Sequence, residues 1–220
     1  MSFFVTGTDT DVGKTLIASA LLHVLAARGL RVVGMKPVAA GSVAGVWHDV
    51  VELEHASNVA APLDARNPYR FHPPIAPHLA VAQTGEIISL PAIDDAYRHL
   101  SSLAEVVIVE GAGGFYVPLN YTESLADVAQ QLNLPVILVV GMRLGCINHA
   151  LLTVAAIQAR GLALAGWVAN CMTADMVLLQ ENIQALEQRI AAPLLGIIPH
   201  TPHISSMQAG QYLHVEKLCL

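Results

Sequence analysis

The sequence contains few charged residues for its length. Only 13% of its 220 residues are Asp, Glu, Lys or Arg, and 11 Lys and Arg against 17 Asp and Glu leave a formal net charge of −6. The cationic residues form no run along the chain. Because affinity for a nucleic-acid backbone needs clustered cations, this composition excludes a general nucleic-acid binder.

Cysteines and targeting signals are also scarce. Cys146, Cys171 and Cys219 show no paired spacing, which indicates reduced thiols rather than a disulfide framework. No uncharged apolar stretch reaches the roughly 18–20 residues that a membrane span needs. The chain starts with a strand-like segment instead of a basic, signal-like one. We therefore expect a cytoplasmic protein that does not bind membranes.

Apolar residues, by contrast, make up 54% of the chain. Strand-like apolar runs alternate with helical segments from residue 2 to residue 198, and no internal repeat is visible. This alternation predicts an α/β fold, with a mainly parallel central sheet covered by helices on both faces. Since the composition does not shift along the sequence, we expect one domain that spans residues 1–220.

The expected elements follow from hydrophobic periodicity and from turn residues. Strands are expected at residues 2–6, 31–35, 106–109, 136–140, 163–169 and 194–198. Helices are expected at residues 16–28, 49–60, 93–103, 124–132, 148–160 and 175–190, with a short one near the end. Residues 38–48 are expected to form a loop. The segment 62–77 contains five prolines, which indicates a loop that either covers the active-site edge or merely connects two elements.

The beginning of the chain has the layout of a phosphate-binding loop. A strand-like run leads into a turn from Gly7 to Gly13, followed by Lys14, Thr15 and a helical segment. The turn N–H groups and the helix dipole favour phosphate, Lys14 can reach terminal phosphates, and Thr15 can ligate Mg²⁺. Five residues separate the glycines where the common pattern has four. A chance Gly-Lys-Thr is the alternative, but the strand–loop–helix context favours a nucleoside triphosphate site.

Three further charged residues are candidates for the same site. Glu110 and Lys36 each follow a predicted strand, and ligands of parallel sheets bind beyond the carboxyl ends of strands. Asp49 is a second candidate oxygen ligand, so Thr15, Asp49 and Glu110 suffice for Mg²⁺. The alternatives are a strand-capping Glu110, a solvated Lys36 and an Asp49 that only stabilises the start of a helix.

Other chemistries are less well supported. Cys146 lies near His149, but an inert buried cysteine is commoner than a nucleophile. His200 and His203 lack the accompanying ligands of a zinc site. The chain also has no Gly-x-Ser-x-Gly element, which excludes that class of hydrolase nucleophile.

Five blocks together resemble the ATP-dependent dethiobiotin synthetases, P-loop enzymes of biotin biosynthesis. They are Gly7–Thr15, Lys36–Gly41, Val109–Gly114, Leu144–His149 and Gly166–Asn170. The five-residue glycine spacing is usual in this family. The resemblance implies a cytoplasmic homodimeric ligase with its active site near the subunit interface. It also implies that MgATP drives carboxylation and ring closure of 7,8-diaminononanoate with CO₂. The products would be dethiobiotin, ADP and phosphate, formed through a carbamate and a carbamic-phosphoric anhydride.

The resemblance also implies roles for individual residues. Lys14 and Lys36 would be catalytic, and Thr15, Asp49 and Glu110 would bind Mg²⁺. ATP would be bound by Asp11, Val12, Gly13, Lys14, Thr15, Leu16, Asp49, Glu110, Gly111, Ala112, Gly113, Asn170, Cys171, Pro199, His200 and Thr201. The substrate would be bound by Thr10, Lys36, Ala40, Gly145, Cys146, Ile147 and Asn148, with Gly145 to Asn148 contributed by the partner subunit.

The chain departs from the family pattern at three positions. Ala40 stands where the family often has serine, Cys171 where it often has aspartate, and Asn182 where a tyrosine contacts the substrate carboxylate. Two alternative functions are found among proteins with the same kind of phosphate-binding loop. One is a partitioning or positioning ATPase switch that acts through protein partners, although such proteins usually carry an extra lysine early in the loop. The other is a glutamine-dependent amide ligase without its glutaminase half.

Overall fold

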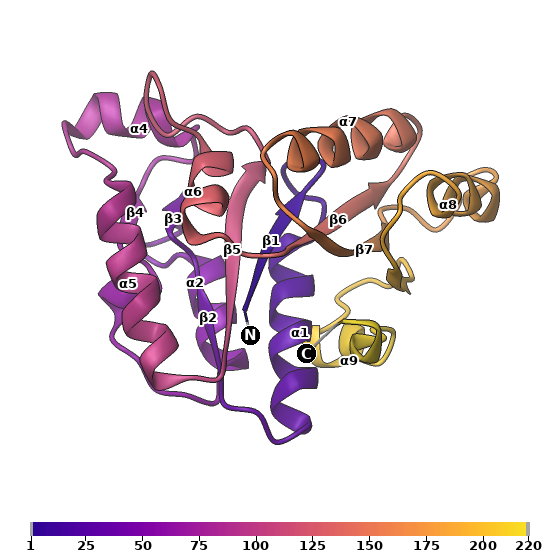
Figure 1. Cartoon of the computed structure of the whole chain (residues 1–220), viewed down its shortest axis with the longest axis horizontal. Helices are drawn as coiled ribbons and strands as arrows, with labels where there is room; N and C mark the ends of the chain where they lie inside the picture. The colour runs from indigo at the N-terminus through magenta and orange to yellow at the C-terminus, as the bar shows by residue number, and fades with distance from the viewer. Residues whose placement is uncertain (1, 219–220) are drawn as a thin grey trace.

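The computed structural model describes residues 2–218, so Cys219 lies outside the described residues. Its centre is a six-stranded sheet in which every neighbouring pair of strands is parallel (Figure 1). The strands lie in the order β2 (Val32–Met35), β5 (Val106–Gly114), β1 (Phe3–Gly7), β6 (Val136–Met142), β7 (Leu164–Cys171) and β8 (Leu194–Ile198). The predicted α/β fold with a parallel sheet is confirmed.

Helices cover both faces of this sheet. One face packs against α1 (Lys14–Ala27), α2 (His48–Ala56) and α9 (Ser206–Gly210). The other packs against α5 (Leu90–Leu103), α6 (Leu125–Leu132), α7 (Cys146–Ala159) and α8 (Leu179–Glu187). Alternation along β1 shows the two layers, since Phe3 and Val5 join the α1 side while Phe4 joins the α5 side. The predicted helices on both faces are confirmed.

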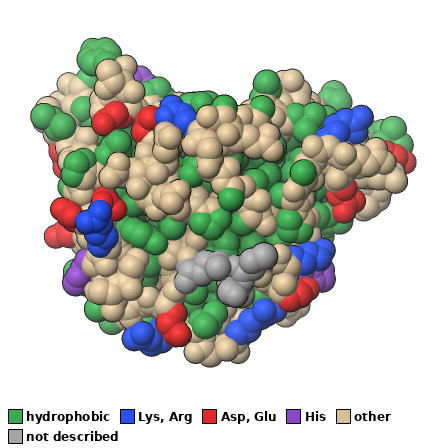
Figure 2. Space-filling model, viewed as in Figure 1, with side chains coloured by type: hydrophobic (Ala, Val, Ile, Leu, Met, Phe, Trp, Pro, Cys, Tyr) green, Lys and Arg blue, Asp and Glu red, His purple; other side chains and the backbone are tan. Residues whose placement is uncertain are grey.

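A smaller unit lies beside the carboxyl edge of the sheet. It contains a parallel pair of short strands, β3 (Val38–Ala40) and β4 (Tyr69–Phe71), with α3 (Leu63–Arg66) between them in sequence. Helix α4 (Pro77–Thr84) follows, and in Figure 1 it stands at the opposite side of this edge from α7. The molecular surface dips between these two sides (Figure 2).

Several predicted element boundaries were wrong in this smaller unit. Residues 38–48 are not all loop, because the first three form β3, and residues 62–77 contain α3 and β4. Two of the prolines lie where helices begin, since Pro62 is the N-cap of α3 and Pro77 opens α4. Proline lacks the N–H that a first helical turn leaves unused, so it favours helix starts.

Two predicted helices are shorter than expected. The helix expected at 49–60 ends at Ala56, and the helix expected at 175–190 spans only Leu179–Glu187.

Near the end of the chain, α9 starts with a capping box in which Ser205 and Gln208 bond reciprocally. A 3₁₀ turn, Val215–Lys217, follows it. No helix within residues 2–218 is long and apolar enough to cross a bilayer.

The C-terminal segment packs directly on β8. The His214 amide donates to the Leu195 carbonyl over 2.7 Å, and a Cβ added at Gly196 would lie 2.1 Å from the Tyr212 carbonyl oxygen. We therefore predict that Gly196→Ala lowers the free energy of unfolding by about 1–3 kcal/mol, because backbone atoms must shift to admit the methyl group. Urea unfolding measures this change.

Gly114→Ala is the matched control, since its new Cβ would meet nothing nearer than 3.9 Å. Its unfolding free energy should stay within about 0.5 kcal/mol of the parent value. Equal effects of the two substitutions would contradict the close packing at Gly196.

Candidate active site

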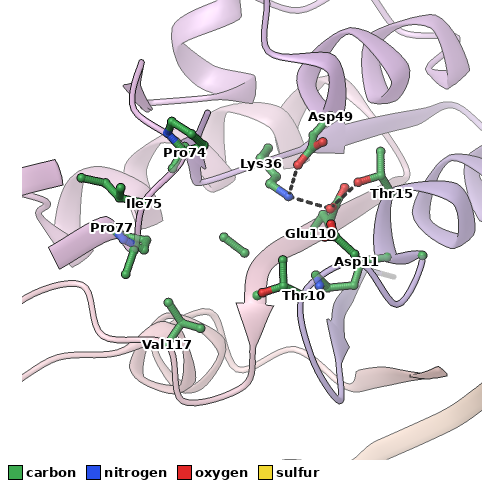
Figure 3. Close-up of a pocket in the computed structure, with 16 residues that line it drawn as sticks. Thr10, Asp11, Thr15, Lys36, Asp49, Pro74, Ile75, Pro77, Glu110 and Val117 are labelled. Carbon is green, nitrogen blue, oxygen red and sulfur yellow. Dashed lines mark hydrogen bonds and ion pairs between the residues drawn. The ribbon is translucent and has the colours of Figure 1, made fainter. Parts of the chain in front are cut away.

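A cavity of about 770 Å³ opens at the carboxyl edge of the sheet. Its polar side is formed by Thr10, Asp11, Gly13, Lys14, Thr15, Lys36, Asp49 and Glu110, together with the small residues Ala40, Ala112 and Gly113. These residues come from the turn after β1 and the start of α1, from the residue after β2, and from β3, α2 and β5. The structure thus gathers eleven of the sequence-predicted site residues around one space (Figure 3).

A buried charge cluster forms the floor of this cavity. The Lys36 Nζ donates to Glu110 Oε1 over 2.6 Å and pairs with Asp49 Oδ2 at 2.8 Å. The Thr15 hydroxyl donates to the same Glu110 oxygen over 2.8 Å. Lys36 is only 3% exposed and Glu110 only 1%. Neither is therefore a solvated surface residue, and Asp49 does more than begin a helix.

Burial and the neighbouring opposite charges shift the pKa values of these groups in opposite directions. Burial alone would lower the pKa of Lys36, but the carboxylates of Glu110 and Asp49 outweigh it and raise that pKa. The reverse holds for Asp49, where the Lys36 ammonium overcomes burial and lowers the pKa of the carboxyl group. Burial dominates at Glu110 and raises its pKa. Lys36 therefore stays charged at the edge of the cavity.

The phosphate-binding loop holds its lysine against its own backbone. Lys14 Nζ donates to the Asp9 carbonyl over 2.7 Å, and the Asp9 carboxylate pairs with Arg143. Gly13 has φ +93°, and a Cβ there would lie 2.3 Å from the Asn170 side-chain nitrogen. That nitrogen donates to the Val12 carbonyl over 2.9 Å. Asn170 therefore braces the loop, which the sequence did not predict.

The charge cluster also offers oxygen ligands for a cation. Glu110 Oε2 is buried and has no hydrogen-bond partner within residues 2–218. Together with the Thr15 hydroxyl and the Asp49 carboxylate it forms the hard, oxygen-only donor set that Mg²⁺ prefers. An unpartnered buried carboxylate oxygen is costly by itself, so the residues present fit a magnesium ion.

An apolar wall faces the polar floor across the cavity. Pro74, Ile75 and Pro77 form it together with Val117 (Figure 3). The sequence predicted a proline-rich loop at this edge as one of two alternatives, and the structure confirms that this segment lines the cavity. The apolar character of the wall was missed, because sequence spacing does not show which side chains of a loop point inward.

Several other predicted residues lie elsewhere. Gly145 to Asn148 do not line the cavity in one chain, and Cys146 is buried beside β6. Pro199, His200 and Thr201 line neither described cavity, and the partly buried Asn182 of α8 donates to the carbonyl of Leu178, the residue before this helix. Cys171 is buried, and burial raises the pKa of its thiol. A second cavity of about 440 Å³ adjoins Thr15 and Leu16 and is lined by Ser205 and Ser206, which were not predicted.

The buried position of Lys14 gives a pH-dependent stability. Burial, with a smaller contribution from Lys36, lowers the pKa of Lys14 from 10.5 to about 8. Between these pH values the unfolded chain holds a proton that the folded chain has lost, so stability rises with pH in this window. Without nucleotide, we predict that Lys14→Met is more stable than the parent at pH 7 by up to about 3 kcal/mol.

This advantage should shrink as the pH rises toward 10.5, and urea unfolding at pH 7 and 9.5 measures it. The exposed Lys217→Met serves as the control. If Lys14→Met is no more stable than the parent at pH 7, or if its gain in stability grows with pH, burial does not lower the pKa of Lys14 as described.

Solved structures with the same fold include P-loop ATPases of distant sequence. The MinC:MinD cell division protein complex of Aquifex aeolicus matches with a TM-score of 0.60 and 14% identity, covering 95% of this chain and 85% of that chain. MinD from Pyrococcus horikoshii, complexed with Mg-ADP, matches with a TM-score of 0.59 and 15% identity, covering 99% and 89%. At such low identity these similarities show the fold alone.

Sequence relatives are much nearer. A family model described as an AAA domain matches residues 1–208. The ATP-dependent dethiobiotin synthetase BioD of Nitrosospira multiformis is 51% identical, over 98% of this chain and 96% of its own length. That of Aromatoleum aromaticum is 50% identical, over 97% of each. These relatives favour the synthetase over the partitioning switch. The chain belongs to the family of ATP-dependent dethiobiotin synthetases.

Proposed function

We propose that the chain uses ATP to carboxylate 7,8-diaminononanoate with CO₂ and to close the cyclic urea of dethiobiotin. One amine would attack CO₂ and lose a proton, giving a carbamate. A carbamate oxygen would take the γ-phosphoryl group from ATP, and the second amine would attack the resulting anhydride and expel phosphate. The observation that carries the proposal is the buried Lys36 ammonium, which faces the same cavity as the phosphate-binding loop.

The residues around the loop would hold the nucleotide. The turn from Asp11 to Leu16 would bind the phosphates, with Gly111 to Gly113 beside them. Thr15, Asp49 and Glu110 would hold Mg²⁺, whose charge would neutralise the phosphate oxygens of bound ATP. The base would extend toward Asn170 and Cys171, with Pro199 to Thr201 near it.

The two lysines would stabilise the negative charge that develops during phosphoryl transfer. Lys36 is fixed by two carboxylates and by the Gly111 carbonyl, so its ammonium is already placed at the cavity and would exchange one of these contacts for the carbamate. Lys14 is held by a single backbone carbonyl and would turn from Asp9 to the terminal phosphate. No side chain has to act as a nucleophile, which agrees with the buried position of Cys146.

The cavity also suits the shape of the substrate. A diamine with an aliphatic tail has a polar and an apolar part, and the cavity has a polar floor and an apolar wall. The reacting nitrogens would lie at Thr10 and Lys36, with Ala40 beside them. The tail would lie along Ile75 and Val117, where burial of each CH₂ contributes about 0.8 kcal/mol.

We propose a homodimer in which Gly145 to Asn148 of each chain complete the partner's substrate site. The neighbouring Leu144 is 97% exposed, and Leu152 of the same region is also exposed. Native mass spectrometry is predicted to show a species of twice the 23.3 kDa chain mass. A monomer at micromolar concentration would contradict this arrangement.

The direct test of the reaction is an assay with purified protein, MgATP, bicarbonate and 7,8-diaminononanoate. Dethiobiotin, detected by its mass, should form in step with ADP. Omission of the diamine should abolish the part of the ATP hydrolysis that the diamine stimulates. ATP hydrolysis that continues unchanged without the diamine, with no dethiobiotin, would contradict the proposed function.

Lys36→Ala separates binding from chemistry. We predict that kcat falls by about 100-fold or more, because a fixed charge at the reacting group is lost. The Kd for MgATP should change only a few-fold, since most nucleotide contacts come from the loop. Lys217→Ala removes an exposed lysine and should change neither quantity. Loss of MgATP affinity with normal kcat at saturation would refute this role of Lys36.

A further inference from the structure

The main chain of Lys36 leaves the sheet just before the site. The register of β2 with β5 ends at the pair Met35 and Val109. Lys36 therefore does not continue the ladder, and its amide donates instead to the carbonyl of Arg66 over 2.7 Å. The position of its ammonium depends on contacts that the sheet itself does not provide.

Asn67 provides the second of these contacts. Its side chain is fully buried, and its amide nitrogen donates to the carbonyl of Lys36 over 2.5 Å and to that of Tyr69 over 3.1 Å. Because both partners are carbonyl oxygens, the side-chain NH₂ group must face them. Asn67 Oδ1 is buried and accepts no hydrogen bond from a described residue. A residue selected for stability alone gains nothing from that unsatisfied oxygen.

The same segment is tied to the helix that carries Asp49. Arg66 is nearly buried, and its guanidinium pairs with Glu54 of α2 at 2.6 Å and donates to the Ala61 carbonyl over 3.1 Å. Residues 66 and 67 thus touch both the backbone of Lys36 and α2. The two groups that meet in the Lys36–Asp49 ion pair are located by one short segment.

We propose that Asn67 is a positioning residue, which fixes the backbone carbonyl of Lys36 so that its ammonium meets Glu110 and Asp49 at the cavity. The catalytic consequence rests on the proposed function of Lys36. A displacement of about 1 Å of a reacting group can lower a rate by about 10²-fold. Loss of the Asn67 amide should therefore lower kcat without changing the loop that holds ATP.

Asn58, in the bend after α2, offers a control at the other end of β2. Its side chain accepts from the Val32 amide over 2.7 Å and donates to the Leu30 carbonyl over 2.8 Å, at the end of β2 remote from the cavity. Asn67→Ala and Asn58→Ala each remove two hydrogen bonds to the main chain. We predict that Asn67→Ala lowers kcat at least tenfold with the Kd for MgATP within threefold of the parent. Asn58→Ala should leave kcat within twofold.

Crystal structures of both variants supply a readout that does not need activity. In Asn67→Ala the Lys36 Nζ should leave hydrogen-bond distance of Asp49 or Glu110, and in Asn58→Ala both contacts should remain. If Asn67→Ala does not fold, the nearly isosteric Asn67→Leu, which fills the same space without donors, takes its place in every comparison.

The outcomes distinguish a failure of the proposed function from a failure of the positioning role of Asn67. If the parent protein makes no dethiobiotin, the proposed function fails, and the crystal structures alone decide the role of Asn67. If Lys36 Nζ keeps its contacts with both Asp49 and Glu110 in the Asn67 variant, Asn67 is not a positioning residue. With an active parent, a kcat of the Asn67 variant within twofold of that of Asn58→Ala would also overturn it, because both variants would then affect stability only.

Discussion

The site depends on one buried cation held between two carboxylates. Taking a charged side chain out of water costs several kcal/mol, so a buried lysine persists only where opposite charges compensate it closely. Glu110 and Asp49 compensate Lys36, and the Lys36 ammonium in turn opposes the rise that burial causes in the pKa of Glu110. The network does not satisfy every atom, because one oxygen of Glu110 lacks a partner among the described residues. That unsatisfied oxygen belongs to one of the three residues proposed to bind Mg²⁺.

The parallel sheet explains why these groups meet. Lys36 follows β2, Glu110 lies in β5, and Thr15 lies in the helix after β1. Since β2, β5 and β1 are neighbours in the sheet, their carboxyl ends bring together side chains that are up to 95 residues apart in sequence. Buried apolar layers pack against both faces of the sheet below this edge. Charge placement at the site is therefore a consequence of strand order, and strand order was not predicted.

The sequence predicted the elements of the fold well where local signals were strong. The Gly-Lys-Thr turn and the apolar runs before Lys36 and Glu110 identified elements that the structure confirms. It predicted less where structure depends on distant contacts. Strands β3 and β4 are three residues each and exist through pairing with one another. Asn67 carried no signal at all, because one of its two partners is the backbone carbonyl of Lys36, on a segment distant in sequence.

Lys36 and the phosphate-binding loop are proposed to act on the same phosphoryl group. The most direct measurement is a crystal structure with Mg²⁺, a non-hydrolysable ATP analogue and 7,8-diaminononanoate. We expect Lys36 Nζ to lie within about 3.2 Å of a terminal phosphoryl oxygen. We also expect the cation to be bound by Thr15, Asp49 or Glu110. A Lys36 ammonium that points away from the terminal phosphate, with the diamine bound in another cavity, would contradict the shared action of Lys36 and the loop.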